Sequence, residues 1–405
     1  MRRRFKITAI CVIMIMMTGM LAGCTTYDNF REAFFGGGGS RDTIKIGVYE
    51  PSTGDFAKEG KLEIQGIELA NKLYPEILGK KVELVYADTG SDLDIARTAA
   101  KDLMMKDPAA VLGSYGSVFS MLGGKYFAKN KVPAIAATNT NPLVTLGNPY
   151  YFRVCFVEAY QGEALAKFTM DSLKVKKAAV MMPADDDQAT AVSDTYSQEM
   201  ISGTDDEEAI TTYQEYEPGS SDFGRKLKKI AASGAKTVFL PGAPNDAVNI
   251  MTQAEKMGLD LTFLGTTLWE DDDFKELIAS EKLDNVYFSA AFDADTVQTD
   301  ETKVFLKAYK KEYDSSDPDQ ATALGFDAYL LAADAISKAG SAQDGSRIAE
   351  ALRSEKNFKG ASGYITFDDN GDPERSVTIN GTADGKIAPV YVVKPESVLK
   401  KEKEN

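Results

Sequence analysis

The sequence contains no histidine. A Ser-His-Asp or Cys-His nucleophile system is therefore excluded, as is any metal site that uses histidine. Cysteine is also scarce: the chain has only Cys11, Cys24 and Cys155, and no Cys-x-x-Cys motif. If Cys11 is removed with a signal peptide and Cys24 is modified, as argued below, Cys155 cannot form an intramolecular disulfide, and we expect it to be a small buried apolar residue. We expect neither a metal nor a cofactor.

The sequence has fewer basic than acidic residues: 46 Lys and Arg and 61 Asp and Glu give a formal net charge of −15. An acidic surface repels a phosphate backbone, so we expect no nucleic-acid partner. With 405 residues, of which 43% are hydrophobic, the chain is long enough for two or three domains with well-buried cores.

The N-terminus has the three parts of a secretory signal. Arg2, Arg3 and Arg4 precede an apolar run from Ile7 to Leu21, and small residues lead to Cys24. The segment Leu-Ala-Gly-Cys resembles the bacterial lipobox, which implies cleavage before Cys24 and lipidation of its sulfur. An uncleaved membrane helix is the alternative, since the run is marginally long enough for one. Residues 1–23 are therefore predicted to be a signal peptide, and residues 24–42, with Gly36–Ser40, a lipidated cysteine and a flexible tether.

From Thr43 onward, short apolar strands alternate with amphipathic helices. Strands are predicted at 44–49, 82–86, 111–113, 134–136, 178–182, 237–240, 263–265 and 286–289. Helices are predicted at 92–105, 161–173, 222–232, 246–257 and 302–313, with a further helical pattern around Ile67–Tyr74. Three strands separated by turn signals follow at 365–367, 377–379 and 390–393. This alternation predicts an α/β protein with two doubly wound, Rossmann-like lobes.

Ligands of open parallel sheets bind beyond the carboxyl ends of the strands. The loops selected by this rule follow Val48, Gly113, Ala136, Met182, Leu240 and Gly265. Two of them are rich in small polar residues, Ser114–Ser117 and Thr138–Pro142. Backbone N–H groups and hydroxyls at a helix start suit a carboxylate, although simple N-capping by Ser117 and Asn141 explains the same residues.

Other polar segments carry weaker signals. Gly54–Lys61 lacks the spacing and the hydroxyl residue of a phosphate loop, and Asp368–Asp372 lacks the spacing of a calcium loop and is better explained as a turn. The acidic runs Asp185–Asp187 and Glu270–Asp273 could serve a carboxylate-only hydrolase, but solvated loops or helix N-termini account for most of them.

The order and spacing of several short motifs resemble the leucine/isoleucine/valine-binding family of type I periplasmic binding proteins, which serve ABC importers. The matching segments are Ile46–Val48, Gly66–Ala70, Val111–Gly113, Val132–Ile135, Tyr151–Arg153, Gln161–Gly162, Asp222–Phe223, Phe326–Tyr329 and Gly363–Gly371. The resemblance implies three crossings between the lobes, placed near Glu158, Ala290 and Phe367. Lobe 1 is then 43–158 with 290–366, lobe 2 is 159–289 with 367–395, and 396–405 is a charged tail.

The resemblance also implies a ligand site in the cleft between the lobes. In amino-acid binders of this family, the first-lobe loops hold the ligand's α-carboxylate, which points to Ser117, Thr138 and Thr140. Glu158 matches an acidic position that could pair with an ammonium group. The second-lobe positions fall near Asp187, Ala243, Thr267 and Glu270, where this chain departs from the family pattern. A small residue at 243 with acidic groups nearby suits a ligand more polar or cationic than leucine.

The expected function is the extracytoplasmic, lipid-anchored substrate-binding component of an ABC importer, with an amino acid or related carboxylate as ligand and a membrane permease as partner. Two alternatives stay open at this point. One is a ligand-binding component of a receptor system, and the other is an extracellular enzyme that uses two carboxylates.

Overall fold

The computed structural model describes residues 43–270, 272–315, 317–396 and 398–399. The predicted signal peptide, Cys24 and the glycine-rich tether lie outside these residues, as do residues 400–405 of the predicted tail. None of the helices in the described part of the chain combines the length and apolar composition needed to span a membrane.

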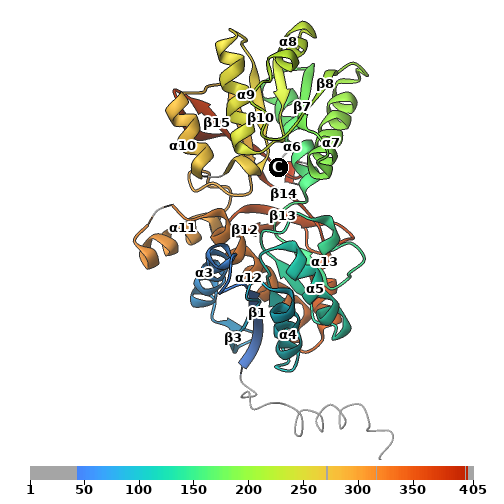
Figure 1. The fold of residues 1–405 in the computed structure, drawn as a ribbon. Helices are drawn as coiled ribbons and strands as arrows, with labels where there is room; N and C mark the ends of the chain where they lie inside the picture. Colours follow the sequence, from blue (N-terminus) through green and yellow to red (C-terminus); the bar gives the residue numbers. More distant parts are fainter. Residues whose placement is uncertain (1–42, 271, 316, 397, 400–405) are drawn as a thin grey trace, which may run out of the picture. The chain divides into compact units, whose positions relative to one another are not determined.

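The first lobe is built on a six-stranded sheet in the order β2-β3-β1-β4-β5-β6 (Figure 1). Its strands are β1 (Thr43–Glu50), β2 (Glu76–Ile77), β3 (Lys80–Asp88), β4 (Ala110–Leu112), β5 (Ala134–Ala136) and β6 (Tyr151–Arg153). The helices between them are α3 (Ala57–Leu73), α4 (Leu93–Met104), α5 (Ser117–Lys129) and the 3-10 turn η1 (Pro142–Val144). β1, β4, β5 and β6 pair in parallel, so their carboxyl ends share one edge of the sheet.

The local sequence of α4 determines where this helix begins and which of its faces is buried. The carboxylate of Asp92 caps its first turn by accepting from the backbone N–H groups of Asp94 and Ile95, at 2.9 and 3.0 Å. Ala96, Ala100 and Leu103 then recur at helical spacing and form the buried face. These residues share one buried cluster with Val85 of β3 and Val111 of β4, so the apolar face of the helix packs against the sheet.

A later part of the chain completes this lobe. It contributes α11 (Asp300–Tyr313), α12 (Gln320–Ala339) and α13 (Gly345–Arg353), then an antiparallel sheet of β12 (Phe358–Gly360), β13 (Gly363–Phe367) and β14 (Pro373–Arg375). Helix α12 packs along α3 and also touches β4 and β5. Buried residues lie on nearly every side of α12, so the helix lacks the polar face that a surface helix has.

The second lobe is built on a seven-stranded sheet in the order β16-β15-β11-β10-β9-β7-β8. Its strands are β7 (Ala178–Pro183), β8 (Ile210–Tyr216), β9 (Thr237–Phe239), β10 (Thr262–Gly265), β11 (Val286–Ala290), β15 (Val377–Ala383) and β16 (Lys386–Val393). Its helices are α6 (Glu158–Asp171), α7 (Asp187–Thr204), α8 (Gly224–Ala232), α9 (Pro244–Lys256) and α10 (Asp272–Glu281), with the 3-10 turn η2 (Thr267–Glu270). β7 to β11 are parallel, and β15 and β16 add antiparallel strands at one edge. The predicted doubly wound α/β fold with two lobes is confirmed.

Three segments of the chain lead from one sheet to the other. The first follows β6, the second follows β11, and the third lies between β14 and β15 at Ser376. Phe367, near which the third crossing was predicted, is the last residue of β13. The division of the chain into lobes at particular residues stays a prediction.

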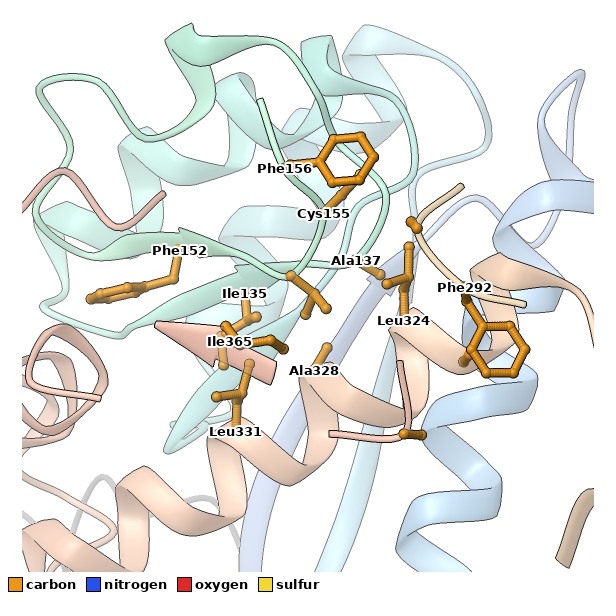
Figure 2. Close-up of a cluster of buried hydrophobic side chains, with 14 of the residues drawn as sticks. Ile135, Ala137, Phe152, Cys155, Phe156, Phe292, Leu324, Ala328, Leu331 and Ile365 are labelled. Carbon is orange, nitrogen blue, oxygen red and sulfur yellow. The ribbon is translucent and has the colours of Figure 1, made fainter. Parts of the chain in front are cut away.

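A buried apolar cluster gathers residues from distant parts of the chain. Figure 2 shows Ile135 of β5, Leu331 of α12 and Ile365 of β13 close together, with Cys155 and Phe156 of the first crossing nearby. Cys155 is 5% exposed and has no disulfide partner, so the prediction of a small buried residue is confirmed. Segments far apart in sequence therefore share one core, and its close packing fixes the positions of the strand ends.

Candidate ligand-binding site

Three first-lobe loops leave the sheet at the same level. Val48 pairs with Leu112, and Leu112 pairs with Ile135, so β1, β4 and β5 are in register at their carboxyl ends. Glu50 is the last residue of β1, and Ser114 and Thr138 lie in the loops after β4 and β5. Because parallel strands end at one edge, the sheet places three candidate loops side by side.

The loop after β4 is tightly fitted against the strand beside it. Gly113 has a φ of 104°, and a Cβ there would lie 2.2 Å from Oε1 of Glu50. Only glycine suits that position, in backbone conformation and in space. Ser114 and Ser120 close the loop, because the Ser114 N–H donates to the Ser120 hydroxyl at 3.0 Å and that hydroxyl donates back to the Ser114 carbonyl at 2.9 Å.

Ser117 is a half-buried residue at the start of a helix. It is the first residue of α5, and the capping position is Gly116, with φ 83° and no side-chain cap. Ser117 is therefore not the N-cap of this helix, and its hydroxyl stands at the positive end of the helix dipole. Asn141, in contrast, does cap η1, by accepting from the Leu143 N–H at 2.9 Å.

Asn139 ties the loop after β5 to the loop after β4. Its side-chain amide donates to the Ser120 hydroxyl at 3.2 Å and to the Ser117 hydroxyl at 3.4 Å. Arg153, fully buried, holds the same loop from below by donating to the carbonyls of Asn139 and Asn141, at 3.0 and 2.8 Å. Sequence reasoning missed both residues, although Arg153 stood in a segment that carries the family resemblance. Buried polar groups with several partners define a unique geometry, so the two loops form one unit.

Thr138 lies over two buried acids. Its hydroxyl donates to Oε1 of Glu63 on α3 at 2.5 Å. Glu50, at the end of β1, accepts from the Tyr115 N–H at 2.6 Å through Oε2. Neither glutamate was a predicted site residue, since a single acid inside a helix or at a strand end gives no sequence signal.

Thr140 and Glu158 are brought together at the first crossing. The Glu158 N–H donates to the Thr140 carbonyl at 3.3 Å, and the Glu158 carboxylate accepts from the Gln161 amide at 3.1 Å. Burial raises the pKa of the Glu158 carboxyl, against the hydrogen bonds from Thr140 and Gln161 that lower it. An acid at the start of a helix is thus set directly beside a first-lobe loop.

Gln161 links Glu158's helix to the second lobe's strand ends. Its Oε1 accepts from the Thr267 N–H and from the Ser289 hydroxyl, both at 2.8 Å. Thr267 therefore stands close to the α6 N-terminus. Gln161 lies in a segment that carries the family resemblance, but its hydrogen bonds with Thr267 and Ser289 could be found only in the structure.

The other second-lobe candidates lie in different surroundings. Asp187 is an exposed first residue of α7, whose cap is Asp186, and Ala243 is an exposed residue at the start of α9. The Glu270 side chain is 12% exposed and paired with Lys275 at 3.2 Å, and it also accepts from the Asn380 amide at 2.9 Å. Burial raises the pKa of Glu270, and the Lys275 charge opposes that rise.

Comparisons with known proteins show to which family the chain belongs. The family model described as a periplasmic binding protein matches residues 43–385. The chain belongs to the periplasmic binding protein family. Within it, the chain resembles the leucine/isoleucine/valine-binding group, as the sequence motifs predicted.

Individual relatives have names that fit this group. The leucine-, isoleucine-, valine-, threonine-, and alanine-binding protein of Pseudomonas aeruginosa is 27% identical over 342 residues, covering 82% of this chain and 87% of that protein. The leucine-binding protein LivK of Thermotoga maritima is 29% identical, with a TM-score of 0.68, over 87% of this chain and 99% of that one. LivJ of Streptococcus pneumoniae, solved in complex with isoleucine, is 26% identical, with a TM-score of 0.66, over 87% and 100% of the two chains. Proteins of this family are substrate-binding proteins rather than enzymes, so the comparisons support a solute-binding role.

Proposed function

We propose that this periplasmic binding protein is the extracytoplasmic substrate-binding component of an ABC importer and that it captures an amino acid, branched-chain or more polar. The observation that carries the proposal is the joining of the two first-lobe loops through Asn139 at the start of α5. Relatives named for leucine, isoleucine and valine binding support the ligand class.

The proposed contacts follow from the chemistry of the loops. Ser117 offers a hydroxyl and a backbone N–H at a helix N-terminus, which suits the ligand carboxylate. Thr140 stands on the adjoining loop, and Glu158 beside it suits the ligand ammonium. Thr138 and Thr267 complete the site at the strand ends of the two lobes.

Asp187, Ala243 and Glu270 are proposed to set the polarity of the far side of the ligand. Asp187 is exposed and has the freedom to contact a polar ligand, whereas Glu270 already has Lys275 as a partner. Calorimetric comparison of Asp187→Ala and Glu270→Ala tests this idea. Tight leucine binding that neither substitution changes would contradict it.

We also infer that a lipid on Cys24 holds the protein at the outer face of the cell membrane, where a permease would receive its ligand. Two acyl chains give a stable anchor where one gives marginal binding. Cys24→Ser should move the protein from the membrane fraction to the soluble fraction, while Cys155→Ser should leave it at the membrane. Retention of Cys24→Ser in the membrane fraction would contradict a lipid anchor.

A thermal-shift screen of the purified protein against amino acids tests the proposed function. A ligand at a hundred times its Kd stabilises the folded state by about 2.7 kcal/mol, which shifts the unfolding temperature by several degrees. We expect one or a few amino acids to give such a shift. The absence of a shift with every amino acid would overturn the ligand class.

A further inference from the structure

Two glutamates lie side by side beneath the first-lobe loops. Glu50 ends β1 and is 1% exposed, and Glu63 lies on the second turn of α3 and is fully buried. The two carboxyl groups are neighbours, since the charge of Glu63 raises the pKa of Glu50, and one buried oxygen of each, Oε1 of Glu50 and Oε2 of Glu63, has no hydrogen bond to an N–H or O–H group of the described residues. Two ionised carboxylates so placed would repel each other and leave both oxygens unsatisfied, whereas one proton shared between them would satisfy both.

Each member of the pair also holds one ligand loop. Oε2 of Glu50 accepts from the Tyr115 N–H at 2.6 Å, next to the glycine that leaves room for its other oxygen. Oε1 of Glu63 accepts from the Thr138 hydroxyl. The Tyr115 loop and the Thr138 loop are therefore joined twice, through Asn139 above and through the acid pair below.

We propose that Glu50 and Glu63 are a positioning pair, which shares one proton and thereby fixes both first-lobe loops in the geometry that binds the ligand. This inference rests on the proposed function, because it assumes that these loops bind the ligand. The two residues act through Tyr115 and Thr138.

The pair also determines whether the Thr138 hydroxyl can donate a hydrogen bond to the ligand or only accept one. A threonine hydroxyl has one proton to donate and two lone pairs that accept. Because Glu63 takes the proton, the Thr138 oxygen can only accept from a further partner. Ionised or neutral, Glu63 thus favours a ligand with N–H groups near Thr138.

The titratable groups that interact with the pair are phenols, a thiol and an acid. They are Tyr49 on β1, Tyr115 on the β4 loop, Tyr151 on β6, Cys155 after β6 and Asp319 at the start of α12. Burial raises the pKa of both glutamates, that of Glu63 to about 7, and the charge of Glu63 raises the pKa of Glu50 further. Loss of the shared proton therefore places two negative charges together without a cation among these neighbours to offset them.

The test compares wild type with Glu63→Gln, Glu63→Leu and a matched control, Glu68→Gln, which removes an exposed charge from the same helix. Glutamine keeps both hydrogen bonds, because its oxygen can accept from Thr138 and its NH₂ can donate to Glu50, but it has no proton to lose. Leucine keeps the volume and removes both bonds. Each protein is measured in two ways between pH 5 and pH 8.5: the unfolding temperature without ligand, and the affinity for L-leucine by calorimetry.

For wild type and Glu68→Gln, the folded state binds more protons than the unfolded state between about pH 4.5 and pH 7. Their unfolding temperature should therefore fall as the pH rises through this range. Their L-leucine Kd should be constant below pH 7 and about tenfold weaker at pH 8.5, since binding then requires uptake of a proton. Glu63→Gln should flatten both profiles, and Glu63→Leu should bind at least about tenfold more weakly at every pH.

A Glu63→Gln protein with the wild-type pH profiles would overturn the positioning pair, whether or not leucine binds. A flattened unfolding profile in a protein that binds no amino acid would support the shared proton and overturn the proposed function instead. Tight, pH-independent leucine binding by Glu63→Leu would overturn the positioning role while leaving the proposed function intact.

Discussion

Arg375 donates from Nη2 to the carbonyl oxygen of Ala291 at 2.7 Å. The same guanidinium donates to the Val154 carbonyl at 2.9 Å and to the Ser362 carbonyl at 3.0 Å. Val154 follows β6, Ala291 follows β11, and Arg375 ends β14. One fully buried side chain therefore joins all three segments that connect the two sheets.

Replacing Arg375 should destabilise the protein strongly. Arg375→Ala removes the donor from four buried carbonyl oxygens, that of Ser376 included, which we expect to lower the free energy of unfolding by about 3 kcal/mol. Arg353 is a matched control, because it also donates to two carbonyls, those of Pro149 and Asp369, but at the surface. Arg353→Ala should cost about 1 kcal/mol or less in urea unfolding. Equal losses for the two variants would contradict the role given to Arg375.

Asp327 supports the same junction from α12. Its carboxylate accepts from the Ala361 and Ser362 N–H groups, at 2.5 and 2.9 Å, and from the Ser362 hydroxyl, which also accepts from Arg375. Asp327→Asn replaces one acceptor oxygen with an NH₂ group that faces donors. We expect a loss of about 2 kcal/mol in the free energy of unfolding. Asp334→Asn, on the outer part of the same helix, should lose less than about 1 kcal/mol.

Cys155 should be unreactive in the folded protein. Burial raises its pKa to about 11, so at pH 8 only about one thiol in a thousand is ionised. Protein that starts at Thr25 contains no other cysteine. Its reaction with a thiol reagent should be slow in buffer and complete within minutes in denaturant. Fast reaction of the folded protein would show that the first crossing opens readily.

The ligand ammonium should be essential for binding. The Thr138 hydroxyl can only accept from the ligand, and Glu158 beside Thr140 is an acid, so a ligand without N–H groups gives neither of them a hydrogen bond. For the amino acid that gives the largest thermal shift, the 2-keto acid of the same side chain should bind at least about a hundredfold more weakly. Competition calorimetry measures this ratio. Comparable affinity for the two compounds would contradict the proposed polarity of the site.

Most of the parallel strands were predicted from the sequence, because most are short apolar runs between turn signals, although β6 was not predicted. The predicted strand at 134–136 coincides with β5, and the predicted strand at 178–182 lies within β7. Helix α12 was missed, since it is buried on nearly every side and has no polar face to give a helical period. The polar strand β8 was missed because residues 210–216 mix exposed and half-buried positions.

The site was predictable only in part. Ser117 and Thr140 follow apolar strands, and the strand-end rule selects such positions. Their partners Asn139, Arg153 and Glu63 could not be identified, because the contacts join loops and helices that are brought together only by the sheet. Nor could a sequence show that the Thr138 hydroxyl is already engaged, since this depends on a residue 75 positions earlier.

The proposed function requires that the first-lobe loops hold an amino acid. Calorimetric titration of that amino acid into wild type, Ser117→Ala and Thr140→Val tests it most directly, with Thr98→Val on the exposed face of α4 as the control. We expect each site variant to bind about tenfold more weakly, because a buried carboxylate loses a hydrogen bond, and the control to bind as wild type does. Unchanged affinity in both site variants would contradict the account.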